Sequence, residues 1–542
     1  MSNRTTSFPL RLATLAVAAC CVVGAAAPAQ AASHRARLSA DLEDHLAAGS
    51  QQIDVILEGD KAAVDALVAR YNLTLKRYLA ESGAVLRVTA GQLAALRDDE
   101  SVEHLSGDVR IKSSDAVTAE TIGADQAWAG TDGLPPLSGK GVAVAVIDSG
   151  IDTTHQAFAG GRVIATRDFT GGSGGDLFGH GTHVAAIIAG QRGTTPDTRD
   201  YRGIAFGAYL VNLRVLGADG SGVVSDVVDA IDWAVAHRNE YNIGIINLSL
   251  GAPVLQPYRD DPLCEAVERA VRKGIIVVTA AGNYGQTADG RSINGFITSP
   301  GNSPYALTVG ALDAHGTPQR SDDTLAAYSS KGPTRYDLVI KPDLAAPGSH
   351  IVSAEAADSY LAKTYASRHV TGSGPNAYLQ LSGTSMAAGV VSGAAALLLD
   401  ARSSLKPSDV KAALQVTSTF LPTAGLLGAG AGGVNVLGAA EFSQKGGSLG
   451  ATQIAGEMAS ASGITFVGPQ DSRVLRGSTI VWDSTIVWDS TIIWDSTIIW
   501  DSTIIGDSTI VWDSTIVWDS TIVWDSTIVW DSTIVWDRSL ID

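Results

Sequence analysis

Short, continuous apolar runs that alternate with amphipathic stretches are the strongest constraint on the fold of this 542-residue chain. Each of the four clearest runs is followed by a helical pattern: 142–147, 209–214, 244–250 and 275–279. A strand that is apolar along its whole length is buried on both faces, which is typical of parallel sheets covered by helices on both sides. We therefore predict an α/β domain with a mostly parallel sheet over residues 115–442. Ligand sites should lie at the carboxyl ends of its strands.

Composition limits the class of protein and its partners. With 45% hydrophobic and 17% charged residues, the chain is too apolar to be disordered. Its length favours roughly two to four folded parts. The formal net charge of −18 argues against nucleic acid or an anionic membrane surface as a partner. We therefore expect no nucleic acid partner.

Residues 1–31 have the three parts of an export signal. A basic region ends at Arg11, an apolar run follows to Ala27, and Ala29-Gln30-Ala31 is a small-residue cleavage site. A membrane anchor is the less favoured reading, because it needs about 20 apolar residues with different flanks. We predict a secreted, extracellular protein whose mature chain begins after residue 31.

The three cysteines bear on anchoring and on stability. Val17-Ala18-Ala19-Cys20 resembles a lipoprotein cleavage box, so lipoprotein anchoring is a minor alternative to secretion. Cys20 and Cys21 leave with the signal, which leaves Cys264 alone and allows no intramolecular disulfide. Cys264 lies in an apolar-periodic stretch and is expected to be a buried small hydrophobe rather than a reactive thiol.

Residues 32–114 are predicted to form a small α+β domain. The pattern is βαββαβ, the split βαβ sandwich. Strands are expected at 53–57, 73–79, 84–88 and 102–111, and helices at 61–70 and 90–96. One role open to such a domain is that of a small regulatory domain.

The C-terminal part is less regular and then strictly repetitive. Residues 443–477 are rich in Gly, Ser and Ala, which predicts a linker or a small extra module. The motif Ser-Thr-Ile-Val-Trp-Asp then occurs ten times over residues 478–537, with Gly506 in place of one Trp, and residues 538–542 end the chain.

The repeats predict a β-rich tail. An even period keeps every Trp on one face of a strand, so a β-solenoid is the favoured arrangement, with short antiparallel strands or an aggregation-prone segment as alternatives. An Asp in every repeat excludes a membrane span. Aligned Asp rows could bind calcium, but solvated charges that oppose aggregation are the favoured role. We expect the tail to self-associate or to bind the cell surface.

Three polar residues occur at element ends, in the order Asp148, His180, Ser385. Asp148 ends the first apolar strand, His180 opens a helix, and Ser385 precedes a strongly apolar helix. A Ser hydroxyl is too weakly acidic to attack an amide unless an imidazole takes its proton and a carboxylate orients that imidazole. The order therefore predicts a catalytic triad.

Each of these residues alone has a simpler explanation. Ser385 could be only a helix N-cap, and a single Asp-Ser-Gly is too little for an aspartic protease, which needs two such motifs. His180 and His183 lack the Glu and the spacing of a helical zinc motif. His183 is expected to be structural. Asn283, which follows the strand at 275–279, adds a side-chain donor for an oxyanion.

At these positions the chain resembles the subtilases, the subtilisin-like serine proteases. The resemblance covers about residues 122–442. It rests on five blocks in the family's order: Val146-Ile147-Asp148-Ser149-Gly150-Ile151, Gly179-His180-Gly181-Thr182-His183-Val184-Ala185, Ser249-Leu250-Gly251, Ala280-Ala281-Gly282-Asn283 and Gly383-Thr384-Ser385-Met386-Ala387. It implies a subtilisin-like fold and a serine endopeptidase in which Asp148, His180 and Ser385 are the triad. Asn283 and the Ser385 N–H would form the oxyanion hole.

The resemblance also implies how substrate is held. Gly220-Ser221-Gly222 and Ser249-Leu250-Gly251 look like the two edge segments that pair with an extended peptide or protein substrate. Thr298 looks like part of the floor of the first specificity pocket, which ends at a cis-proline, Pro300. The chemistry would require no cofactor. Structural calcium is compatible with the family, but no metal site can be assigned, and Ala157 stands where many subtilases have a calcium-binding Asp.

By the same resemblance, residues 32–114 look like the inhibitory propeptide of a zymogen. Its own propeptide would then be an intramolecular partner, removed by self-cleavage near residues 112–115. The chain departs from the family pattern at Gly389, where subtilases have Pro after the nucleophile. Two other classes stay open: a catalytically silent subtilase-like binding protein, and a surface or assembly protein whose tail is its main function.

Overall fold

The computed structural model describes residues 35–107 and 114–445 with short gaps, residues 450–467, and a few short strands in the repeats. The gaps are 39–41, 43–44, 47–51, 58, 80–82, 173–174, 196–197, 199–200 and 288. The predicted signal peptide, the junction at 108–113 and most of the repeats lie outside the described residues. The chain forms two compact units, residues 1–111 and 112–542.

The first unit has the predicted βαββαβ order. Its elements are β1 (Arg37–Leu38), β2 (Ile53–Leu57), α2 (Lys61–Tyr71), β3 (Thr74–Tyr78), β4 (Ala84–Val88), α3 (Ala90–Arg97) and β5 (His104–Gly107). The sheet order is β1-β5-β2-β4-β3, and only the added edge strand β1 pairs in parallel. Asp60 caps α2, and Thr89 with Gln92 forms a capping box on α3, which explains why both helices begin where the sequence predicts.

The second unit is built on an eight-stranded sheet with the order β12-β11-β10-β9-β6-β8-β7, with β13 beside β11. All its pairings are parallel except that of β11 with β12. Its strands are β6 (Ala143–Asp148), β7 (Val163–Asp168), β8 (Tyr209–Arg214), β9 (Ile243–Leu248), β10 (Ile276–Ala280), β11 (Leu307–Asp313), β12 (Thr324–Leu325) and β13 (Leu344–Pro347). The predicted parallel sheet is confirmed.

The helices and the smaller elements surround this sheet. The helices are α4 (Ser114–Thr121), α5 (Ala124–Ala129), α6 (His180–Ala189), α7 (Val224–Ala236), α8 (Arg238–Tyr241), α9 (Pro262–Arg272), α10 (Tyr360–Thr364), α11 (Thr384–Ala401), α12 (Pro407–Thr417), α13 (Gly425–Ala429) and α14 (Val436–Lys445). Short 3-10 turns are η1 (Gln156–Phe158), η2 (Tyr258–Asp260), η3 (Ala366–Arg368) and η4 (Gly374–Asn376). A second sheet has the antiparallel order β14-β16-β15, formed by β14 (Ile351–Ala354), β15 (His369–Thr371) and β16 (Tyr378–Leu381).

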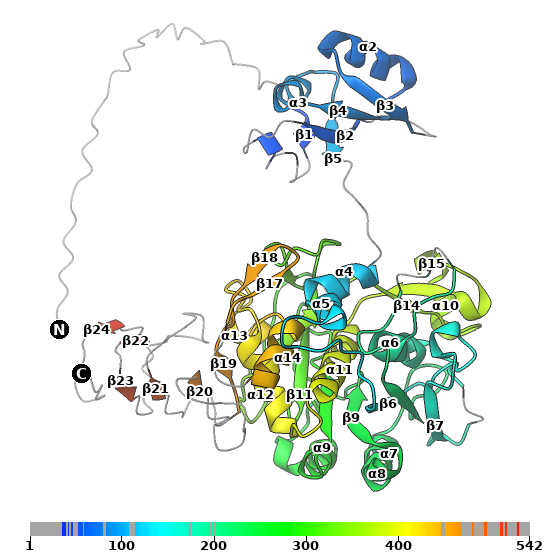
Figure 1. The fold of residues 1–542 in the computed structure, drawn as a ribbon, viewed down its shortest axis with the longest axis vertical. Coiled ribbons are helices and arrows are strands. Elements are labelled where there is room, and N and C mark those ends of the chain that lie inside the picture. Colours follow the sequence, from blue (N-terminus) through cyan, green and yellow to red (C-terminus); the bar gives the residue numbers. More distant parts are fainter. Residues whose placement is uncertain are drawn as a thin grey trace, which may run out of the picture. The chain divides into compact units, whose positions relative to one another are not determined.

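Strand β6 shows why the sheet needs helices on both faces. Its six residues are all buried. Ala143, Ala145 and Ile147 pack in one apolar cluster with residues of α7 and α9, whereas Val144 and Val146 pack in another with residues of α6 and α11. Because side chains alternate along a strand, an unbroken apolar run places apolar side chains against the helices on both faces of the sheet. Figure 1 shows these layers on opposite sides of the sheet.

Helix α11 is the central helix of this unit. It is apolar and long enough to cross a membrane, but 78% of it is buried inside the fold. Small residues let its neighbours approach closely. A Cβ placed on Gly393 would lie 2.6 Å from Ile204 Cβ, and one on Gly389 would lie 3.2 Å from Ile187 Cγ2 in α6. Gly389, where the family pattern has Pro, is therefore a packing contact with the helix that carries His180.

The described residues between 443 and 467 are more than a plain linker. Helix α14 continues to Lys445, and a hairpin follows, formed by β17 (Thr452–Ile454) and β18 (Glu457–Ala459). The Glu457 carboxylate accepts hydrogen bonds from Arg320 N (2.8 Å), Ser321 N (3.1 Å) and Ser321 Oγ (2.6 Å). The hairpin is thus fixed to the second unit.

The segment after the hairpin is fixed by Gln415 of α12. Gln415 Oε1 accepts hydrogen bonds from Thr465 Oγ1 (3.0 Å) and Phe466 N (3.1 Å). Thr465 is buried, and Ile464 with Thr465 forms β19. Of the two predictions for 443–477, the described residues fit a small module that is built into the second unit. The sequence pattern did not reveal this module, because its strands are only two or three residues long and lie in a segment rich in Gly and Ser.

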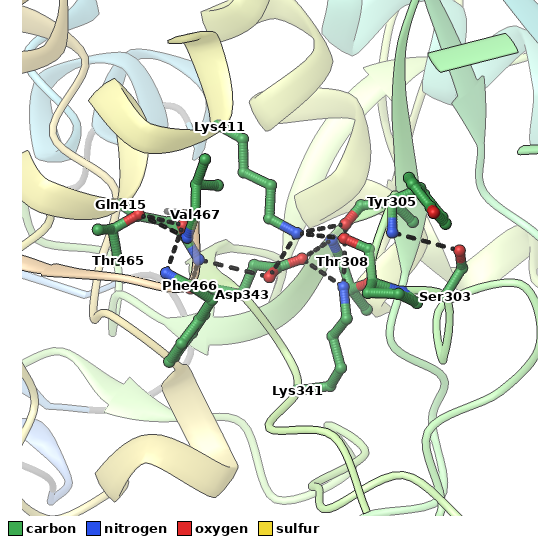
Figure 2. Close-up of polar contacts among 12 residues, drawn as sticks. Ser303, Tyr305, Thr308, Lys341, Asp343, Lys411, Gln415, Thr465, Phe466 and Val467 are labelled. Carbon is green, nitrogen blue, oxygen red and sulfur yellow. Dashed lines mark hydrogen bonds and ion pairs between the residues drawn. The ribbon is translucent and has the colours of Figure 1, made fainter. Parts of the chain in front are cut away.

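Gln415 also belongs to a buried charged cluster, formed by Lys341, Asp343 and Lys411 (Figure 2). Lys341 Nζ lies 2.7 Å from Asp343 Oδ2, and Lys411 Nζ lies 3.0 Å from Asp343 Oδ1. Both ammonium groups also donate to the Ala306 carbonyl at 2.9 Å. Two lysine side chains therefore share one carboxylate inside the fold.

In the repeats the structure describes five short strands: β20 (Ile480–Val481), β21 (Ile493–Asp495), β22 (Ile510–Trp512), β23 (Thr515–Val517) and β24 (Ile528–Trp530). β20 pairs in parallel with β19, β21 pairs with β23 antiparallel, and β22 pairs with β24 in parallel. The predicted solenoid otherwise falls on residues outside the description.

Candidate active site

Asp148 and His180 meet at the carboxyl edge of the sheet. Asp148 is the last residue of β6 and is buried, and His180 is the first residue of α6. His180 Nδ1 lies 2.8 Å from Asp148 Oδ1 and 3.0 Å from Oδ2. A Cβ on Gly181 would clash with the Gly150 carbonyl oxygen, so only glycine lets the helix start come this close to the strand exit. The sequence-predicted pair is in hydrogen-bond contact.

A second carboxylate, Asp176, holds the turn that carries His180. Its Oδ1 accepts from Gly179 N (2.7 Å) and Ser149 Oγ (2.8 Å). Its Oδ2 accepts from Thr182 N (2.8 Å) and Thr182 Oγ1 (2.6 Å). Burial raises the pKa of Asp176 above its ordinary value, and the four donors on its two oxygens oppose this by stabilising the carboxylate. Sequence reasoning missed Asp176, although an Asp a few residues before a helix start is a known capping signal.

The two histidines of this helix have opposite electrostatic surroundings. Burial alone would lower the pKa of His180, but the charge and hydrogen bond of Asp148, with the charge of Asp176, raise that pKa above its ordinary value. Burial lowers the pKa of His183 to about 3. His183 Nε2 lies 3.0 Å from the Leu379 carbonyl oxygen, to which it donates. His183 is therefore neutral and structural, as the sequence predicts.

Ser385 lies in the first turn of α11. Its hydroxyl donates to the Ser249 carbonyl at 3.1 Å, and Ser249 Oγ donates back to the Ser385 carbonyl at 2.9 Å. Ser249 is fixed in turn by Asn247 Nδ2, 3.0 Å from its Oγ. This reciprocal pair joins the start of α11 to the end of β9, so Ser385 contacts Ser249, which lines a cleft together with His180.

Asn283 faces the start of α11. Its Oδ1 accepts from Thr384 N and Thr384 Oγ1, both at 3.0 Å. With its oxygen occupied, the amide nitrogen Nδ2 points away from these donors and is available to donate. The Asn283 side chain is exposed, and a Cβ on Gly383 would lie 3.5 Å from Nδ2. The amide is thus beside Gly383, the residue that precedes the first turn of α11.

A cleft of about 460 Å³ lies between the two predicted edge segments. Gly220, Ser221 and Gly222 line one side, and Ser249, Leu250 and Gly251 line the other. His180 and Phe178 lie at the edge of this cleft. Its remaining lining is mainly aliphatic: Leu216, Val223, Val224, Val227, Ala252, Pro253 and Leu263. The arrangement can hold an extended chain with an apolar side chain.

Thr298 lies behind the second edge segment. A Cβ on Gly251 would lie 2.5 Å from Thr298 Oγ1, so the two backbones are packed closely. Ala252 and Ser299 exchange two backbone hydrogen bonds of 2.9 Å, and the Ser299–Pro300 peptide bond is cis. Thr298 therefore supports the segment that Gly251 belongs to.

Among the residues that the structure describes, no group of three or more His, Cys, Asp or Glu side chains is arranged to hold a metal ion.

Known proteins resemble the unit that carries this site. The model of the Subtilase family matches residues 139–456, more than half of the chain. The chain belongs to the subtilase family. The match begins just before β6 and ends between β17 and β18, so it includes every predicted site residue and extends beyond the predicted boundary at 442.

The chain is also similar to individual known proteins. The chain is 39% identical over 287 residues to the serine protease AprX of Bacillus subtilis (strain 168), covering 52% of this chain and 61% of that protein. It is 34% identical over 344 residues to the extracellular serine proteinase of Thermus sp. (strain Rt41A), covering 62% of this chain and 71% of that protein. The solved structure of sphericase aligns with a TM-score of 0.46 and 28% identity, covering 58% of this chain and 97% of sphericase.

Proposed function

We propose that this subtilase is a secreted serine endopeptidase in which Asp148, His180 and Ser385 form the catalytic triad. The observation that carries the proposal is the Asp148–His180 contact of 2.8 Å, made by a histidine that lines the same cleft as Ser249, the hydrogen-bond partner of Ser385. His180 Nδ1–H donates to Asp148, which leaves Nε2 as the basic nitrogen. Apolar lining and two edge segments favour an extended peptide or protein substrate.

The reaction would proceed through an acyl-enzyme. Ser385 Oγ attacks the peptide carbonyl carbon while His180 Nε2 takes its proton, so the hydroxyl must first turn from the Ser249 carbonyl. The imidazolium, stabilised by Asp148, then protonates the leaving amine as the C–N bond breaks. Water attacks the ester in the same way, with His180 again as the base. No cofactor takes part.

The tetrahedral intermediate would be stabilised from two directions. The Ser385 N–H is one of the first N–H groups of α11, which have no acceptor inside the helix. Asn283 Nδ2 supplies the second donor, with its orientation fixed by Thr384. Preorganised donors of this kind typically contribute about 10²–10³ in kcat each.

Hydrolysis of unfolded casein by the purified mature chain tests this function. The expected result is cleavage that a sulfonyl fluoride abolishes and a metal chelator leaves unchanged at the chemical step. Ser385→Ala should lower kcat by about a millionfold, the figure known for subtilisin, a relative of this protein. Turnover near the wild-type rate in folded Ser385→Ala would refute the triad. A folded wild type with no activity would favour the silent binding protein.

The first unit is proposed to be an inhibitory propeptide of the zymogen. Parallel sheets fold slowly because their contacts are distant in sequence, so a folding template is physically reasonable. Wild type should lose residues 32 to about 114 by self-cleavage, and Ser385→Ala should keep them, as intact-mass measurement would show. An uncleaved but fully active wild type would contradict this role.

Secretion and the role of the repeats are proposed from the sequence. The N-terminal export signal supports an extracellular location. The Thermus relative is also named as an extracellular enzyme. The repeats are proposed to serve self-association or attachment to the cell surface, because in-phase Trp residues would otherwise expose a long apolar stripe.

A further inference from the structure

An aromatic pair borders the cleft on the His180 side. The rings of Phe178 and Tyr360 are stacked, with centroids 5.7 Å apart and planes inclined by 15°. The Phe178 centroid is 6.4 Å from that of His180. Phe178 is partly buried, whereas Tyr360 at the start of α10 is 49% exposed. The mechanism above uses neither ring.

The tip of the Phe178 ring reaches across to the first edge segment. A Cβ placed on Gly220 would lie 2.5 Å from Phe178 Cζ and 2.7 Å from both Cε atoms. Gly220 also has a positive φ of 77°, which favours glycine. Phe178 therefore bridges the loop before His180 and the segment that is proposed to hold substrate.

The position of Phe178 is fixed from two sides. Gly179 N donates to Asp176, which fixes the backbone after the ring. On the other side, Tyr360 N donates to the Leu177 carbonyl (2.8 Å), and Leu361 N donates to the Phe178 carbonyl (3.0 Å). Helix α10 thus supports both the backbone and the ring, and the bridge is a built feature rather than one rotamer of a surface side chain.

We propose that Phe178 restricts the substrate side chain that lies beside His180 to a small one, and that Tyr360 is a positioning residue for Phe178. This inference rests on the proposed peptidase function. In an extended substrate, successive side chains alternate between faces. If the residue at the cleaved bond faces Thr298, the residue before it faces His180, Phe178 and Gly220.

The same alternation separates this position from the apolar end of the cleft. Side chains on one face of a strand recur every second residue, about 6.6–6.8 Å apart. The residue two positions further from the cleaved bond would reach Val224, Val227 and Leu263, where a large apolar side chain fits. On the His180 side, the Phe178 ring packs against Gly220, and this contact narrows the space there. The two subsites should therefore differ in the size that they accept.

Two quenched fluorescent peptides test the restriction. Both contain one casein bond that wild type cleaves, and they differ only at the residue before the one at the cleaved bond, which is Ala in one and Trp in the other. Wild type should prefer the Ala peptide by about tenfold or more in kcat/KM. Phe178→Ala should reduce this preference to about threefold or less by a gain on the Trp peptide.

Variants at position 360 separate positioning from general disruption. Tyr360→Ala should relax the preference in the same direction, whereas Tyr360→Phe keeps the ring and should leave it unchanged. Tyr365→Ala, an exposed aromatic change in the residue after α10, is the matched control and should also leave it unchanged. If Phe178→Ala does not fold, Tyr360→Ala decides, because cleavage of the Ala peptide reports its folding.

The outcomes distinguish failure of the size restriction by Phe178 from failure of the proposed peptidase function. Equal cleavage of both peptides by wild type, faster cleavage of the Trp peptide, or unchanged preference in Phe178→Ala and Tyr360→Ala would overturn the restriction while leaving the peptidase intact. Absence of any serine-dependent cleavage by folded wild type would overturn both.

Discussion

At the scale of single residues, the site depends on charges that lie behind His180. Asp148 could be predicted, because it ends an apolar strand at the edge where ligand sites form. Asp176 could not, because its role depends on Ser149 and Thr182, which only the fold brings to it. The contact of Phe178 with Gly220 was likewise invisible, since no periodicity relates two loops.

Asp176→Asn should move the acid limb of activity. The base form of His180 is neutral, so kcat/KM should rise with pH through the raised pKa of His180, above its usual value. Removing the charge of Asp176 should lower that pKa and shift the limb to lower pH. In Asp176→Asn the new amide NH₂ group would also face hydrogen-bond donors in place of an accepting oxygen. This loss of hydrogen bonds should lower kcat/KM by about tenfold or more.

A pH profile of kcat/KM for both proteins measures this shift. Asp232→Asn, in an exposed ion pair with Arg269, is the control and should leave the profile unchanged. An unshifted limb in Asp176→Asn would show that Asp176 acts on structure alone.

The buried cluster of Lys341, Asp343 and Lys411 should make stability depend on pH. Burial lowers the pKa of Lys341 to about 7, from 10.5 in an exposed lysine. Between these values the unfolded chain binds more protons than the folded chain, so the free energy of unfolding should rise with pH. That stability is lost as pH falls through about 7.

Denaturant unfolding at pH 7 and pH 10 checks this prediction. In an inactive Ser385→Ala background, the rise should exceed that of Lys341→Met by about 1 kcal/mol or more. Identical pH dependence in the two proteins would contradict a depressed Lys341 pKa.

At the scale of elements, apolar patterns predicted the strands well and the boundaries of small elements poorly. β2, β4 and β8 have the predicted bounds, because alternate side chains of β2 and nearly all side chains of β4 and β8 are buried. The strands β17, β18 and β19 are too short to show any period. They are held by side-chain bonds from Glu457 and Thr465, which a composition rich in Gly and Ser does not reveal.

Gly393→Ala should destabilise the second unit. The new Cβ would lie 2.6 Å from Ile204 Cβ in a fully buried contact. Overpacking of this kind costs about 1–3 kcal/mol, more than the helix propensity that alanine gains. Thermal unfolding in the Ser385→Ala background measures the change. Gly389→Ala, with a looser 3.2 Å contact to a side chain, should cost less; the reverse order would contradict this packing.

At the scale of the whole molecule, the enzyme should end within the segment at 450–467 rather than at 442. Truncation after residue 477 should leave peptide hydrolysis within a few-fold of full length, since every predicted site residue precedes it. Truncation after residue 448 removes Glu457 and Thr465, which leaves Gln415 Oε1 and the Arg320 backbone without their partners. This shorter chain should lose thermal stability and activity together. Equal stability of the two truncations would restore the linker interpretation.

Labelling by a sulfonyl fluoride tests the central claim most directly, because it reports which hydroxyl His180 activates. After brief exposure of the mature wild-type chain, peptide mass spectrometry should find a single adduct, on Ser385, formed in step with loss of casein hydrolysis. His180→Ala and Ser385→Ala should stay unlabelled under the same conditions. An adduct on another residue, or equal labelling of Ser385 in His180→Ala, would contradict the catalytic triad.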